Sequence, residues 1–112
     1  MILYRPMGQK EFDLVVQSNY TKFPPRLPEQ PIFYPVLNLE YARQISKWNV
    51  DNEGISYIVK FEQDDDYMKF FDIQIVGAKD IAQEYWIPAE ELDVFNFNIV
   101  GRKIELVETI TK

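Results

Sequence analysis

Two absences limit the side chains that this chain offers for chemistry. The 112 residues include no histidine and no cysteine. Histidine is the commonest general base and a frequent metal ligand, and serine or cysteine nucleophiles usually depend on one. Without thiolates there are no disulfides and no zinc–sulfur sites. Catalysis would therefore rest on carboxylate, tyrosine, lysine, arginine, hydroxyl or backbone groups, and we predict no metal centre.

The residues that best combine into a candidate site are spread over three predicted strands. Arg5 ends the first, Phe33 and Tyr34 lie in the second, and Glu84 opens a late one between large apolar residues. Burial beside aromatic rings raises the pKa of a carboxyl group, and a nearby arginine opposes that shift. The alternative is that Arg5 and Glu84 are ordinary surface residues at strand ends. The chain has no glycine-rich motif for cradling phosphates.

Hydrophobic patterns predict one α+β domain spanning residues 1–112. Apolar runs and period-two alternation indicate strands, and apolar residues at helical spacing indicate helices. The expected strands cover 2–5, 32–37, 55–61, 71–76, 84–87 and 104–110, and the expected helices cover 9–17, 39–48 and 89–97, with a short helical turn at 64–70 and a turn at 77–80. This order favours a small single domain with a mixed or antiparallel sheet and about three helices.

Two of these segments carry more detailed predictions. Asn38 is a favourable N-cap for the helix at 39–48, whose Tyr41, Ile45 and Trp48 recur at helical spacing and are predicted to face the core. Four prolines within 20–31 exclude regular structure there. We expect a stiff surface loop in that segment, anchored to the core by its aromatic residues.

Composition limits the classes of molecule that this protein is expected to bind. A formal net charge of −6, with no lysine–arginine cluster, argues against a broad nucleic-acid surface. A local pocket for an anion remains compatible with this charge, because one arginine can hold a pyrophosphate. No apolar run is long enough to span a bilayer, and the first residues do not form a signal peptide. We therefore expect a cytoplasmic protein without a membrane partner.

Several segments resemble a family of short bacterial proteins that carry the label "ADP-ribosylation/crystallin J1". The matching stretches are 4–6, 23–26, 30–38 and 83–92. A second, weaker resemblance is to the ADP-ribosyltransferase fold, which includes the poly(ADP-ribose) polymerase and toxin-like branches. The three motifs that carry it occur in the order typical of that fold: Leu3-Tyr4-Arg5-Pro6, Ile32-Phe33-Tyr34 and Gln83-Glu84-Tyr85-Trp86-Ile87.

The second resemblance implies a role for each candidate residue. NAD would be the substrate, Arg5 would hold a phosphate or the adenosine ribose, and Phe33 or Tyr34 would stack on nicotinamide. Glu84 would be the catalytic carboxylate that stabilises the positive charge growing on the ribose. The implied activity is that of an ADP-ribosyltransferase or an NAD glycohydrolase.

Two other functions remain open from the sequence. One is a binding or regulatory module that keeps the scaffold without the chemistry, since a fold does not fix a function. The other is an acidic partner of a basic protein, which the net charge would favour through electrostatic steering. The enzymatic function would be favoured over these two if one cleft brought together Arg5, an aromatic residue and Glu84.

Overall fold

The computed structural model describes residues 1–77 and 81–112, so the predicted turn at 77–80 lies mostly outside the described residues. The strands are β1 (Ile2–Met7), β2 (Ile32–Phe33), β3 (Ile55–Gln63), β4 (Ile73–Ile75), β5 (Gln83–Tyr85), β6 (Ile87–Pro88) and β7 (Ile99–Thr111). The helices are α1 (Gln9–Gln17), α2 (Leu39–Glu53), α3 (Asp65–Met68) and α4 (Leu92–Phe97), with a 3-10 turn η1 (Ala89–Glu91) before α4. The α+β class is as the sequence predicts.

All strand pairs among the described residues are antiparallel. The main sheet has the order β1-β3-β7, and β4 pairs with β5. The segment around Val36 joins these two parts, because Val36 pairs with Tyr4 of β1 and with Glu84 of β5. Its neighbours Pro35 and Leu37 make the backbone hydrogen bonds to β5. Pro35 is one reason why the predicted strand at 32–37 shrinks to β2 and this bridge, since proline has no N–H for a ladder.

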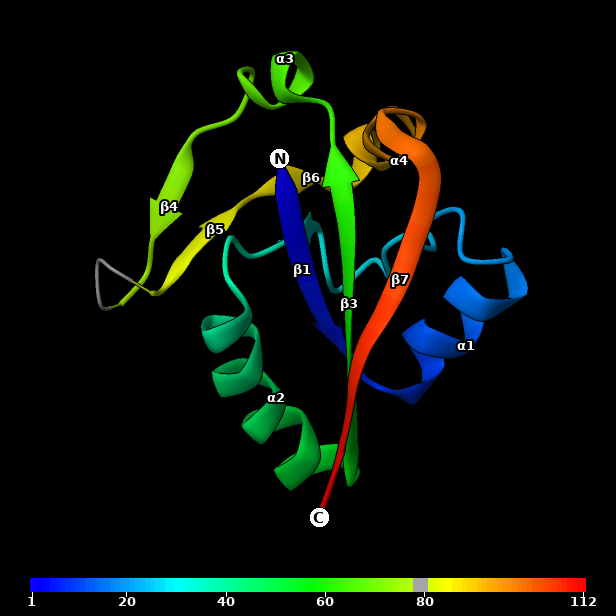
Figure 1. Ribbon diagram of the computed structural model, residues 1–112, viewed down its shortest axis with the longest axis vertical. Coiled ribbons are helices and arrows are strands. Elements are labelled where there is room, and N and C mark those ends of the chain that lie inside the picture. Colours follow the sequence, from blue (N-terminus) through cyan, green and yellow to red (C-terminus); the bar gives the residue numbers. More distant parts are fainter. Residues whose placement is uncertain (78–80) are drawn as a thin grey trace.

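The helices cover the two faces of the main sheet. Figure 1 shows α1 and α2 on opposite sides of the strands β1, β3 and β7. The larger core lies on the α1 side, where Phe12 and Val15 of α1 meet the interior faces of β1 and β3 and the aromatic residues of α4 and the proline-rich segment. The smaller core lies under α2 and is built on Val36, Ala42 and Ile58.

Helix α2 begins where the sequence predicts and ends later. The Asn38 side chain accepts a hydrogen bond from the Tyr41 amide at 2.7 Å, which confirms the N-cap, and Gly54 ends the helix at a φ of 82°. Tyr41 and Ile45 are half-buried and pack against the smaller core, as predicted. The prediction that Trp48 faces the core is wrong, because this residue is 64% exposed. The fully buried positions of the helix are Ala42, Ser46, Asn49 and Val50. Buried hydrogen bonds from Asn49 to Ser56 and from Ser56 to Ser46 allow this polar face to pack on β3.

The proline-rich segment is anchored as predicted. Phe23 is fully buried and packs against Phe33 and Phe61. The side chain of Asn96 in α4 accepts from the Phe23 amide and donates to the Phe23 carbonyl, both at 2.9 Å. These two hydrogen bonds satisfy the backbone N–H and C=O groups of Phe23, which no strand pairs with among the described residues. They also hold in place the segment that leads to residue 26.

None of the helices formed by the described residues is long and apolar enough to cross a membrane.

Candidate functional site

A cleft lies along the open edge of β1. Tyr4 exchanges both backbone hydrogen bonds with Val36, at 2.9 and 2.8 Å. In an antiparallel strand the next residue facing that edge is Pro6, which has no N–H to continue the pairing. Among the described residues, no strand pairs with this edge beyond Tyr4, and a cleft of about 500 Å³ lies beside it.

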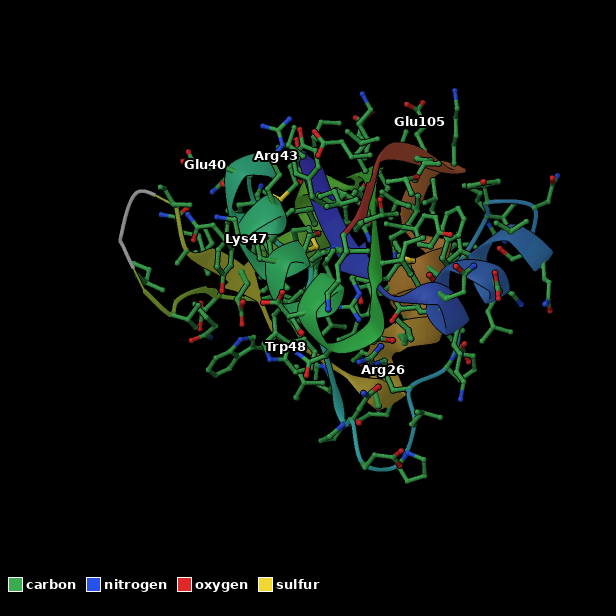
Figure 2. The ribbon with its side chains drawn as sticks, turned by 90° about the horizontal axis from the view of Figure 1, so that it is seen from below. Arg26, Glu40, Arg43, Lys47, Trp48 and Glu105 are labelled. Carbon is green, nitrogen blue, oxygen red and sulfur yellow. The ribbon has the colours of Figure 1, made fainter. Side chains whose placement is uncertain are left out.

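Three segments besides β1 form the walls of this cleft. They are the start of α1, the proline-rich segment through Tyr34, and the end of α2. The polar or aromatic residues among the lining are Arg5, Lys10, Glu11, Arg26, Gln30, Tyr34, Trp48, Asn49 and Glu53. In Figure 2, which views the molecule from below, Arg26 and Trp48 lie on the same side, and Arg43 and Glu105 lie on the other.

Two buried arginines share one carboxylate in the wall of the cleft. Glu11 accepts from Arg5 Nε at 2.9 Å and from Arg5 Nη2 at 2.8 Å, and it accepts from Arg26 Nη1 at 3.3 Å. The arginine side chains are each 6% exposed. Arg5 Nη1 and Arg26 Nε are buried without a hydrogen-bond partner among the described residues. The cluster therefore carries one excess positive charge and two unused donors.

The electrostatics of this cluster follow from that imbalance. Burial by itself would raise the pKa of Glu11, but the two arginines outweigh it and hold the pKa below its usual range. Burial opposes the charged form of Arg5 as well, yet Glu11 raises the pKa of Arg5. The pKa of Arg26 is lowered, by burial first and then by the positive charge of Arg5. Arg26 is thus the cation with the least compensation.

Arg5 lies between two aromatic rings. Its guanidinium carbon is 5.0 Å from the centre of the Phe33 ring and 4.8 Å from that of Tyr34. Such contacts stabilise a cation and hold its plane in place. Phe33 is completely buried, whereas Tyr34 is half-buried and lines the cleft. Of the two aromatic residues left open by the sequence, Tyr34 is the one that a ligand in this cleft would contact.

Glu84 lies on the other face of the sheet. Residues opposite each other on antiparallel strands point to the same face, so Glu84, Val36 and Tyr4 share one side. Arg5 follows Tyr4 directly in β1 and points to the other side. Glu84 is not among the residues that line the cleft. The structure therefore brings Arg5 and Tyr34 together and separates Glu84 from Arg5.

Two aromatic side chains bind the Glu84 carboxylate. Trp86 Nε1 donates to it at 2.6 Å and the Tyr41 hydroxyl donates at 3.1 Å, while the residue as a whole is 8% exposed. Burial raises the pKa of Tyr41 to about 12, and the charge of Glu84 adds to the shift. Tyr34 contributes to the same shift, so Tyr41 lies within electrostatic reach of both Glu84 and the cleft.

The sequence did not single out Glu11, Arg26, Trp48 or Glu53 as site residues. The six-residue spacing from Arg5 to Glu11 crosses a strand–helix junction, for which no periodic rule exists. The sequence offered only a weak signal: Arg5 and Arg26 flank two acidic residues, Glu11 and Asp13, in segments predicted to be ordered. Within the described part of the chain, no group of three or more acidic side chains is arranged to hold a metal ion.

Comparisons with known proteins add no family to this description. Neither a scan against protein-family models nor searches of curated proteins and of solved structures gave a match for this chain.

Proposed function

We propose that the chain is a binding module whose cleft takes a nucleotide or a related organic anion, with NAD as the first ligand to test. The observation that carries this proposal is the Arg5–Glu11–Arg26 cluster, which has an excess positive charge and two buried donors without partners. An uncompensated buried charge is costly, and a bound anion would relieve that cost. Guanidinium groups suit phosphate and carboxylate because they donate in a planar fork.

The other walls favour an anion that also carries an apolar or planar part. Pro24, Pro25 and Pro31 give the cleft rigid apolar surface, and Tyr34 and Trp48 place two aromatic side chains on it. A volume of about 500 Å³ lies within the range of roughly 300–1,000 Å³ that small-molecule sites occupy. A nucleotide would place its phosphates at the arginines and its base or nicotinamide ring against an aromatic wall.

Binding can be followed by tryptophan fluorescence, because Trp48 lines the cleft and Trp86 does not. A Trp86→Phe background leaves Trp48 as the only indole. We expect saturable changes on titration with NAD, ADP, AMP or inorganic phosphate. Absence of any response to all four at millimolar concentration, confirmed by calorimetry, would overturn the proposal.

The matched pair of variants is Arg26→Gln and Arg43→Gln. Arg26→Gln leaves Arg5 and Glu11 as a neutral pair, so the fold keeps its balanced ion pair while the excess charge disappears. We expect an affinity lower by about tenfold or more, the usual effect of losing a hydrogen bond to a charged group. Arg43→Gln removes the same charge from the exposed contact with Glu108, far from the cleft lining, and should leave the affinity unchanged.

Cleavage of the NAD glycosidic bond is a second candidate, and one observation favours it. Tyr41 and Trp86 hold the buried Glu84 carboxylate in a fixed orientation, as a group that must stabilise developing charge requires. A carboxylate there would stabilise the oxocarbenium-like transition state. The test is nicotinamide release from NAD by the wild type and by Glu84→Gln. Release that is absent in the wild type, or unchanged in Glu84→Gln, would exclude Glu84 as the catalytic group.

A further inference from the structure

The start of α1 forms part of the same cleft and is uncapped. Its N-cap is Gly8, and no described side chain accepts a hydrogen bond from the first turn. The first helical bond runs from the Phe12 amide to the Gly8 carbonyl. The amides of Gln9, Lys10 and Glu11 therefore have no partner within the helix. They carry the partial positive charge that makes a helix start attractive to anions.

A carboxylate of the chain itself lies at this helix start. Glu53, the last residue of α2, lies so close to Gly8 that a methyl group on Gly8 would overlap both oxygens of its carboxylate. Gly8 thus leaves the space that an acidic group occupies. Glu53 is an exposed residue, and among the described residues it makes no hydrogen bond or ion pair. Within the described residues, no hydrogen bond or ion pair therefore holds Glu53 in this position.

We infer that Glu53 is an internal competitor, and that the acidic group of the ligand binds at the start of α1 in its place. This inference rests on the proposed function. A helix start alone would not identify a site. Here Arg5 and Arg26 also line the same cleft, and each of these 6% exposed side chains keeps one buried nitrogen without a hydrogen-bond partner among the described residues.

The charges in the cleft favour a phosphate over a singly charged carboxylate. Lys10, Arg5 and Arg26 supply three positive charges, and Glu11 and Glu53 supply two negative ones. Once Glu53 turns out to solvent, the cleft has two excess positive charges. A phosphomonoester carries nearly two negative charges at pH 7 and three acceptor oxygens, which can receive helix amides and guanidinium donors together. Glu53 would then lower the affinity for every anion by a similar factor, because each must displace the same carboxylate.

The test compares Glu53→Gln with Asp51→Asn in the Trp86→Phe background. Both variants remove one negative charge from the end of α2, but only Glu53 lines the cleft. The probes are inorganic phosphate, AMP and NAD, with acetate as the monoanion. Glu53→Gln should bind the three phosphate-bearing probes roughly fivefold more tightly than the wild type, the size of a favourable charge interaction at a helix end. It should gain by a similar factor for acetate, because any anion at the helix start displaces the same carboxylate, and the gains should shrink at 0.5 M salt.

The outcomes separate this inference from the proposed function. If the phosphate probes bind and Glu53→Gln matches the wild type, or if Asp51→Asn gains equally, Glu53 is not a competitor although the cleft still binds anions. If none of the probes binds either the wild type or Glu53→Gln, both proposals fail together. If Glu53→Gln binds more weakly, Glu53 supports the site and the inference is overturned.

Discussion

Replacing Glu11 with glutamine tests the central claim about the cleft, that two arginines depend on one carboxylate. Glutamine keeps the size of the side chain, but it has one acceptor oxygen and would turn an NH₂ group toward a guanidinium. The three hydrogen bonds that Glu11 accepts, at 2.8, 2.9 and 3.3 Å, cannot all survive. Arg5 and Arg26 would then be buried together without a negative charge.

The expected loss of stability is large. Removing one partner of a buried ion pair typically costs about 3–5 kcal/mol. A chain of this length has a free energy of unfolding of roughly 6–17 kcal/mol. Glu11→Gln should therefore remain folded but lose a substantial share of its stability. With a denaturant slope of about 2 kcal/mol per molar urea, the unfolding midpoint should fall by roughly 2 M.

Urea unfolding followed by circular dichroism measures this midpoint. The matched control is Glu108→Gln, which makes the same change in the exposed pair with Arg43 and should shift the midpoint little. If Glu11→Gln also unfolds within a few tenths of a molar of the wild type, the arginines do not depend on this carboxylate. The explanation of the cleft's charge would then be refuted.

Three further predictions concern the same framework. The pKa of Glu11 is lower in the folded state than in the unfolded chain. The stability that ionised Glu11 contributes is therefore complete above the unfolded pKa of about 4.3 and is lost as the pH falls through the folded pKa. Urea midpoints measured between pH 7 and pH 3 should fall less in Glu11→Gln than in the wild type. Asn96→Ala leaves the Phe23 amide and carbonyl buried without partners, so it should lower the free energy of unfolding by about 2–4 kcal/mol. It should also weaken ligand binding, because it loosens the segment that carries Arg26. The control Asn52→Ala, at an exposed position, should change neither stability nor binding. Gly54→Ala should lower the free energy of unfolding, measured by thermal denaturation, by about 1 kcal/mol. The cause is the φ of 82° alone, since nothing lies within 4 Å of the added carbon. An unchanged stability would show that the helix end relaxes.

Local patterns in the sequence predicted most elements. The α+β class, the helix at 9–17 and the Asn38 cap all follow from interactions between residues a few positions apart, which local patterns report well. The buried face of α2 followed only in part. Tyr41 and Ile45 pack against the smaller core, but Trp48 is exposed, and the most deeply buried face includes Ser46 and Asn49. Ser56 on β3 offers these two residues hydrogen bonds, and only the packed sheet reveals that partner.

In the candidate site, too, some features followed from the sequence and others from tertiary packing. The sequence by itself determined that any chemistry must do without histidine and cysteine, and it drew attention to Arg5, Tyr34 and Glu84 as polar or aromatic residues in apolar strands. Only the tertiary structure decided which of them meet. The pleat of β1 and the bridge through Val36 place Arg5 and Glu84 on opposite faces of the sheet, since side chains alternate along a strand and match across it. Folding also brought Glu11, Arg26 and Glu53 to the lining of one cleft from two helices and the proline-rich segment, and charges this far apart in sequence meet only when the chain packs.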